Sequence, residues 1–171
     1  VTGPSAGDNI TRTLQSKFDD FASVKDFGAT GDGSTDDTLA INRALFQLFC
    51  RGSNTEIRRS LYFPAGTYRV TGTINIPPYA KIYGEGSESS IIKLESAADY
   101  VVRTADSLQQ TGANIGNNGA VTPRNIEVYG MTFWSNETTS EVALVQDVQQ
   151  MYFEDVNFQG PLDRTDLSTA S

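Results

Sequence analysis

The arrangement of apolar and polar residues changes from a helical period to a strand period after the first third of the chain. A helix is predicted over residues 37–50, because its apolar residues follow the i, i+3, i+4, i+7 spacing of one helix face: Ile41, Ala44, Leu45 and Leu48. Beyond this helix, apolar and polar residues alternate in short runs that Gly and Pro separate. These runs predict strands over residues 61–63, 67–70, 73–76, 81–83 and 91–94.

A repeat of 25 residues relates two apolar segments near the end of the sequence. Their apolar positions match in four pairs: Ile126 with Met151, Val128 with Phe153, Met131 with Val156 and Phe133 with Phe158. The Ile82-Tyr83-Gly84 and Val128-Tyr129-Gly130 motifs lie 46 residues apart, which indicates two somewhat shorter repeats. Such a period is typical of a solenoid, in which each coil buries its apolar row on the next. We therefore predict a mainly β protein, folded as a parallel β-helix whose N-terminal end is closed by the 37–50 helix.

The segment before the predicted helix is rich in Gly and Asp and follows a short predicted strand at 24–29. Ser34 and Asp37 are spaced as in a capping box, and carboxylates suit the N-terminus of a helix. The polar residues of this segment are therefore expected to form a structural cap: Asp32, Ser34, Asp36 and Asp37. The alternative is a phosphate or cation held by residues 31–33.

The sequence divides into three parts. Residues 1–22 are expected to be a linker and a short helix, whose apolar stripe either rests on the domain or contacts other chains: Ile10, Leu14, Phe18 and Phe21. Residues 23–55 form the predicted N-terminal cap, with a strand and a helix. Residues 56–171 form the predicted first coils of the β-helix, with a long loop near 104–122 that is rich in Gly, Asn and Gln.

Composition narrows the classes of function. The chain has 171 residues, with 13 Lys and Arg against 21 Asp and Glu, and its net charge of −8 disfavours binding to nucleic acid or to anionic membranes. It has no His and a single cysteine, Cys50, which argues against Ser-His-Asp chemistry, most zinc sites and a disulfide framework. No apolar run approaches the roughly 20 residues of a membrane span. We predict no cofactor, no metal and no membrane insertion.

Two stretches, residues 23–38 and residues 63–68, closely resemble the pectate-lyase-like superfamily of right-handed β-helices. The resemblance implies a right-handed parallel β-helix in which the Asp-Gly-x-Thr-Asp-Asp motif, here residues 32–37, is structural. The segment at 12–18 looks like the one that joins a virion anchor to the β-helix in bacteriophage tailspikes. That likeness implies a homotrimeric spike that binds, and usually cleaves, bacterial surface polysaccharide.

The 25-residue register also identifies candidate chemistry. If Val128 and Phe153 point inward, the residues on either side of each point outward on one face: Glu127, Tyr129, Tyr152 and Glu154. The Cα atoms of Glu127 and Glu154 would then be about 8 Å apart, within the separation that inverting glycosidases use. The two glutamates are weak catalytic candidates, and Tyr129, Tyr152 and Trp134 are candidates for sugar contact. The alternatives are a solvated or subunit-facing surface for the first four residues and plain packing for Trp134.

Three functions remain open. The favoured one is the N-terminal portion of a phage tailspike, located in the virion, with other tail components, its own copies and host surface polysaccharide as partners. The others are a secreted bacterial β-helix lyase or glycoside hydrolase and a non-catalytic adhesive domain. Because the sequence begins at Val1 and shows no closing cap after its last coils, we expect a longer parent protein. That parent is expected to be a polysaccharide hydrolase or lyase, and this stretch to lack a complete active site.

Overall fold

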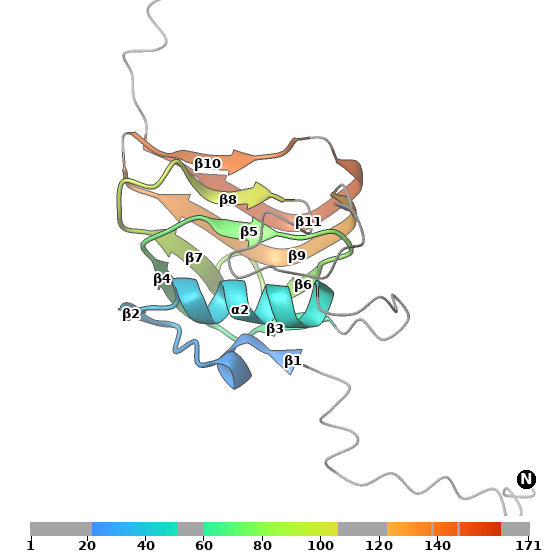
Figure 1. Cartoon of the computed structure of the whole chain (residues 1–171). Coiled ribbons are helices and arrows are strands. Elements are labelled where there is room, and N and C mark those ends of the chain that lie inside the picture. The colour runs from blue at the N-terminus through green and yellow to red at the C-terminus, as the bar shows by residue number, and fades with distance from the viewer. Residues whose placement is uncertain (1–21, 51–59, 106–122, 138, 147, 162–171) are drawn as a thin grey trace, which may run out of the picture.

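The protein is mainly β and contains one α-helix within the residues that the structure describes (Figure 1). The computed structural model describes residues 22–50, 60–105, 123–137, 139–146 and 148–161. In chain order the elements are β1 (Ala22–Ser23), the 3₁₀ helix η1 (Val24–Phe27), β2 (Asp32–Asp36), α2 (Thr38–Phe49), β3 (Leu61–Phe63), β4 (Gly66–Val70), β5 (Ile74–Ile76), β6 (Lys81–Gly84), β7 (Ser90–Leu94), β8 (Tyr100–Thr104), β9 (Arg124–Ser135), β10 (Glu141–Leu144) and β11 (Gln149–Gln159). The helix and the five strands predicted between residues 61 and 94 are confirmed, with bounds shifted by one residue at most sites.

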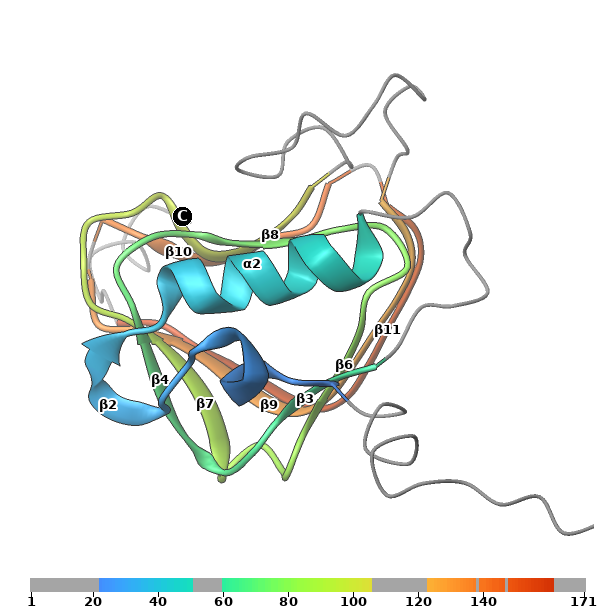
Figure 2. The ribbon, with the colours of Figure 1, turned by 60° about the horizontal axis from the view of Figure 1, so that its bottom comes forward.

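All pairs among the described strands are parallel. In this part of the chain, one sheet has the order β1-β3-β6-β9-β7-β4-β2, with β11 also paired to β9, and a second has the order β10-β8-β5. Each repeat of the chain contains three strands. The strands β3, β4 and β5 of one repeat pair with β6, β7 and β8 of the next, respectively, and successive repeats stack in this way to form the two sheets. The long strand β9 pairs with both β6 and β7, and β10 then returns to β8. Viewed along the stack, these positions outline three sides of a triangle (Figure 2).

The register of β11 on β9 matches the sequence repeat. All four predicted apolar pairs lie directly opposite one another, from Ile126 with Met151 to Phe133 with Phe158. The prediction for the 46-residue offset is wrong, because Ile82 lies directly opposite Val128 and Tyr83 opposite Tyr129. A single repeat therefore separates β6 from β9, and residues 106–122 lengthen it without adding a described strand.

Three columns of inward-facing side chains form the core between the sheets. The columns consist of Leu61, Ile82, Val128 and Phe153; of Tyr68, Ile92, Phe133 and Phe158; and of Ile74, Val102 and Ala143. Members in the middle of the stack are buried almost completely, as are Ile41 and Leu45 on the inner face of α2. Alternation of apolar and polar residues along each strand produces these columns, since successive side chains point to opposite faces.

The end of the stack that carries α2 differs from the sequence prediction in its local structure. Residues 24–27 form a 3₁₀ helix rather than a strand, because Ser23 and Asp26 make the capping box there. The predicted box of Ser34 and Asp37 is wrong: Asp37 occupies the N-cap position of α2, but its side chain makes no capping bond. The helix lies against β5, and the Asn42 amide bonds to the Thr73 carbonyl and the Asn75 N–H (3.1 and 3.0 Å).

At two corners, where the chain turns from one strand position to the next, residues of successive repeats share a left-handed backbone conformation. At one corner, Tyr79, Asn125 and Gln150 have φ values of 63°, 51° and 63°. At the other, Gly130 (φ 60°) in β9 is followed 25 residues later by Asp155 (φ 51°) in β11. The Asp155 carboxylate accepts hydrogen bonds from the Ser87 N–H (3.0 Å) and hydroxyl (2.6 Å), which holds this corner to an earlier repeat.

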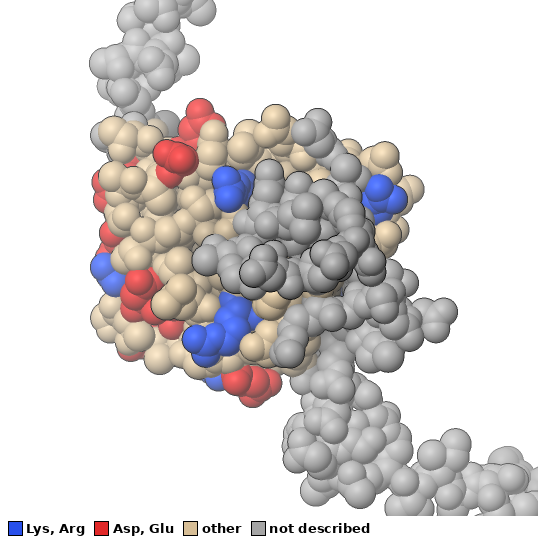
Figure 3. Space-filling model, in the orientation of Figure 1, with Lys and Arg blue, Asp and Glu red and all other residues tan. Residues whose placement is uncertain are grey.

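Some predictions lie outside the described residues. These are the linker and short helix within residues 1–21, and nearly all of the predicted loop at 104–122. In the described part of the chain, no helix is long and apolar enough to cross a membrane. On the face shown in Figure 3, the basic side chains outside the grey atoms are scattered among acidic ones and form no continuous patch.

Candidate functional site

The Asp-rich segment at the start of α2 is saturated with internal hydrogen bonds. The fully buried Asp37 carboxylate accepts from the backbone N–H groups of Thr30 (2.8 Å) and Gly31 (3.0 Å). Asp32 accepts from the N–H groups of Ser34 (2.9 Å) and Thr35 (2.7 Å), and these bonds hold the pKa of Asp32 well below its usual value. The carboxylate oxygens of Asp37 and Asp32 thus accept hydrogen bonds from the protein's own backbone.

Asp36 connects the start of α2 to the turn after β4. Its carboxylate accepts from the Thr38 N–H (3.0 Å), the Thr38 hydroxyl (2.5 Å) and the Thr71 hydroxyl (2.7 Å). Partial burial raises the pKa of Asp36, but the hydrogen bonds from Thr38 and Thr71 outweigh it, so the pKa lies below its usual value. Ser34 contributes its backbone carbonyl, which accepts from Arg69 at 3.4 Å. All four residues assigned to the cap thus lie in one hydrogen-bonded segment.

The predicted face of glutamates and tyrosines is formed by the first halves of β9 and β11. Glu127 lies opposite Tyr152, and Tyr129 lies opposite Glu154. Each tyrosine donates to the glutamate two residues away on its own strand: Tyr129 to Glu127 and Tyr152 to Glu154, both at 3.1 Å. Burial, and then the hydrogen bond to Glu127, raises the pKa of Tyr129 to about 12. The bond to Glu154 likewise raises the pKa of Tyr152.

The same face continues onto β6, which the sequence argument missed. Lys81 lies opposite Glu127, and its ammonium is 2.9 Å from the Glu127 carboxylate. This hydrogen bond raises the pKa of Lys81. Tyr83 stacks on Tyr129 with ring centroids 4.7 Å apart and planes 6° apart, and Tyr152 follows at 5.7 Å from Tyr129. One strand further, Tyr62 lies opposite Tyr83 and donates to Glu85.

A shallow depression of about 410 Å³ opens beside this face, at the start of β9 and β11. Its lining residues are Asn125, Ile126, Glu127, Gln150, Met151 and Tyr152. Asn125 and Gln150, neither of which the sequence argument identified, have the left-handed conformation of the corner and are exposed. A depression of this size with a few polar groups matches the lower range of small-molecule sites.

The geometry gives weak support for hydrolysis by Glu127 and Glu154. A glycosidase needs one carboxyl group held protonated, typically by an apolar environment. Glu154 is exposed, and Glu127 is half-buried beside the Lys81 ammonium. The described residues contain no group of three or more acidic or thiol side chains that could hold a metal ion. Binding to sugar hydroxyl groups fits these carboxylates better than acid catalysis does.

Trp134 lies on a different side of the molecule from the tyrosines. It follows the corner at Gly130, where β9 leaves β6 and begins to pair with β7. The Lys93 ammonium covers its ring, 4.7 Å from the centroid, and also pairs with Glu95. A ring face occupied by an internal cation–π contact is a poor platform for sugar. The structure therefore does not bring Trp134 together with Tyr129 and Tyr152.

Part of the sequence is similar to proteins named as enzymes of polysaccharides. The chain is 38% identical over 99 residues to a probable glucan endo-1,3-β-glucosidase of Arthroderma benhamiae, a match that covers 55% of this chain and 11% of the relative. It is 39% identical over 93 residues to the mannuronan C5-epimerase AlgE2 of Azotobacter vinelandii, covering 48% of this chain and 9% of the relative. The chain thus spans about a tenth of the length of these curated relatives.

Structural similarity extends to proteins of bacterial viruses. ORF18 of Geobacillus virus E2 matches with a TM-score of 0.62 and 23% identity, over 84% of this chain and 27% of that chain. The N-terminal fragment of bacteriophage phi29 gene product 12 matches with a TM-score of 0.55 and 20% identity, over 78% and 21%. At these identities the likeness shows a shared fold. A family model matches residues 21–167, and the chain therefore belongs to the rhamnogalacturonase A/epimerase, pectate lyase-like family.

Proposed function

We propose that this chain is the N-terminal portion of a phage tailspike that attaches the virion to polysaccharide on the bacterial surface. The observation that carries the polysaccharide-binding part of the proposal is the outer face on which tyrosines of four paired strands, β3, β6, β9 and β11, lie beside carboxylates. Aromatic rings and carboxylates are the side chains that bind sugar rings and their hydroxyl groups. The names of the two polysaccharide-active relatives support the same class of ligand.

The proposal includes a finer description of the fold. The parallel repeats are taken as the first coils of a closed right-handed β-helix, with α2 as the cap of its N-terminal end. Support comes from the Asn42 amide, which meets the edge of β5 where a further strand would pair. In the full spike we expect three copies of the chain, and a parent protein that cleaves polysaccharide at a site completed outside the residues described here.

The attachment role is tested by locating the protein. Antibodies raised against the 171-residue chain should label the tails of phage particles in immunogold electron micrographs and should reduce adsorption of those particles to their host. Labelling restricted to particle-free culture supernatant would contradict the proposal and would favour a secreted enzyme. Sedimentation equilibrium of the parent protein should give three times the mass of one copy, and a monomer would contradict the trimer.

The names of the relatives also favour a second candidate, a bacterial β-helix enzyme acting on polysaccharide. Both candidates predict that the parent protein shortens a bacterial surface polysaccharide, which size-exclusion chromatography of the digested polymer measures. Binding without any shortening would favour an adhesive role. At saturating polysaccharide, the Glu127→Gln and Glu154→Gln variants of the parent should keep most of the cleavage rate, because neither carboxylate lies in the surroundings of a general acid.

A further inference from the structure

Of the four tyrosines on this face, Tyr152 is the most exposed. Tyr83 and Tyr129 are stacked nearly parallel, so each ring covers a face of the other. Tyr152 ends the described column, is tilted by 49° from Tyr129, and is 52% exposed. Since a sugar ring packs on the face of an aromatic ring, the platform is Tyr152, and Tyr129 supports it from behind.

The depression next to Tyr152 has one charged group in its lining. That group is the carboxylate of Glu127, while Asn125 and Gln150 add neutral amides that both donate and accept hydrogen bonds. Lys81, outside the lining, is 2.9 Å from Glu127 and pairs with it. A second carboxylate, Glu154, accepts the hydrogen bond of the Tyr152 hydroxyl. No cation belongs to the described lining of the depression.

This distribution of charge selects among sugars. A uronate unit would bring its own carboxylate beside that of Glu127, the one charged group in the described lining, and the nearby Lys81 ammonium already pairs with Glu127. The hydroxyl groups of a neutral sugar can donate to the Glu127 carboxylate and accept from the amides of Asn125 and Gln150. Such hydrogen bonds to a charged acceptor are among the stronger ones in proteins.

We propose that the depression binds a neutral hexose unit of a polysaccharide, with Tyr152 as its platform, and discriminates against polyuronates. The inference rests on the proposed function only in taking polysaccharide as the ligand. It goes further in assigning an uncharged sugar, unlike the mannuronan in the name of one relative. Tyr152, Glu127, Asn125 and Gln150 are the residues that would contact this sugar.

The experiment is isothermal titration of the full 171-residue chain with hexasaccharides of matched length. The neutral probes are β-1,3-linked glucose, β-1,4-linked glucose and α-1,4-linked glucose, and the acidic probes are hexamers of mannuronate and galacturonate. At least one neutral hexamer should bind 10-fold or more tightly than either uronate. Tyr152→Ala should weaken that binding by 10-fold or more, whereas Trp134→Ala, an aromatic residue of another side, should leave it within 2-fold.

A variant that removes the charge of Glu127 but keeps the size of its side chain tests whether this charge disfavours uronates. Glu127→Gln should strengthen binding of the uronate hexamers several-fold, because it removes a carboxylate and leaves Lys81 without that partner. Circular dichroism establishes that each variant is folded; Tyr152 is half-exposed, and its truncation leaves the buried columns intact. Uronate binding equal to or tighter than all neutral probes would overturn the inference, as would no binding of any hexamer.

These outcomes are distinguishable from failure of the attachment role. Binding of a neutral hexamer at Tyr152 together with antibody labelling confined to particle-free supernatant would overturn attachment and support the inference. Labelled virions together with a preference for uronate would overturn the inference alone. Loss of neutral binding in Trp134→Ala but not in Tyr152→Ala would also overturn the inference, because the platform would then lie on the other side.

Discussion

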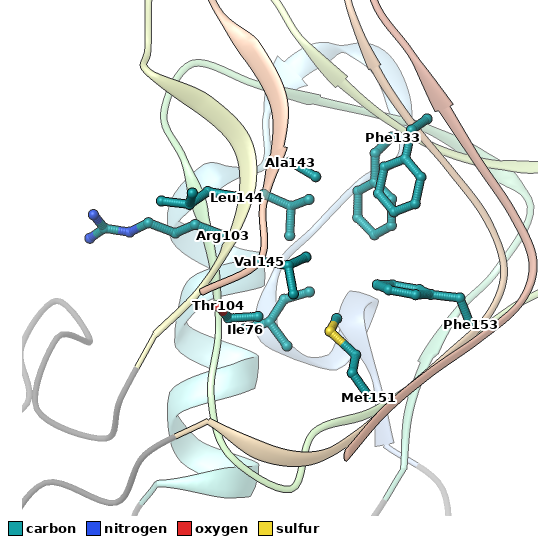
Figure 4. Close-up of a pocket in the computed structure, with 11 residues that line it drawn as sticks. Ile76, Arg103, Thr104, Phe133, Ala143, Leu144, Val145, Met151 and Phe153 are labelled. Atoms are coloured by element: carbon teal, nitrogen blue, oxygen red, sulfur yellow. The ribbon is translucent and has the colours of Figure 1, made fainter. Parts of the chain in front are cut away.

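The two ends of the stacked strands contain the same kinds of residue but bury them very differently. At the α2 end, Ile41 and Leu45 are fully buried and Asn42 bonds to the backbone of β5. At the β11 end, Phe158 is 43% exposed and the neighbouring Val145 is 51% exposed. Figure 4 shows Val145, Met151 and Phe153 pointing into the same apolar space between β10 and β11. Burial in a stack of parallel strands depends on the next repeat more than on the residue itself.

The comparison is strongest within one column. Phe133 and Phe158 lie opposite each other on β9 and β11, with ring centroids 5.5 Å apart and planes 15° apart. Phe133 is 1% exposed because β7 lies on its other side, where Ile92 is its partner. Phe158 is covered by the described strands on one side only. The pair therefore provides a test in which residue type and strand position are matched and burial differs.

The largest effect should come from truncating the buried member of this pair. Phe133→Ala should lower the free energy of unfolding by about 3–5 kcal/mol, since it opens a cavity among packed side chains. Phe158→Ala should lower it by roughly 1–2 kcal/mol, because part of that ring already contacts water. Denaturant titration followed by circular dichroism measures both. Equal losses for the two variants would show that Phe158 is buried in solution by a contact outside the described residues.

A second, smaller effect concerns polar groups at the α2 end. Asp37→Ala removes a fully buried carboxylate and its two part-buried hydrogen bonds from the N–H groups of Thr30 and Gly31, which should cost about 2–4 kcal/mol. Asp37→Asn keeps one acceptor oxygen and should cost less. Asp32→Ala is the matched control, because its donors, Ser34 and Thr35, face water. A loss for Asp32→Ala as large as that for Asp37→Ala would show that the buried carboxylate of Asp37 stabilises the fold no more than the exposed one of Asp32.

The stacking of β11 on β9 could be predicted because both strands are long and their apolar residues repeat after 25 positions. The same register placed Glu127 beside Tyr152 and Tyr129 beside Glu154, as the structure has them. Strands β8 and β10 were missed: β8 borders the segment assigned to a loop, and none of the four residues of β10 is fully buried. The sequence alone does not specify which strands will cover such short runs.

The candidate site was predicted only in part for a similar reason. The contact of Lys81 with Glu127 requires β6 to be the direct neighbour of β9, and the residues between β8 and β9 hide that repeat in the sequence. The covering of Trp134 by Lys93 depends in turn on the register of β7 with β9. The left-handed conformation of Gln150 is set by its place at a corner, because glutamine, unlike the asparagine at position 125, has no strong preference for it.

The smallest effect should be the pH dependence of the α2 end. The pKa of Asp36 is lowered in the folded protein, so its hydrogen bonds stabilise the fold above the unfolded pKa of about 4 and this stabilisation is lost as the pH falls through the folded pKa. Wild type should therefore melt at a higher temperature than Asp36→Asn at pH 6, and the difference should shrink towards pH 3. Thr71→Val removes one donor to the same carboxylate and should show a similar but smaller convergence. A difference between wild type and Asp36→Asn that stays constant over this range would mean that the ionised carboxylate does not stabilise the α2 end.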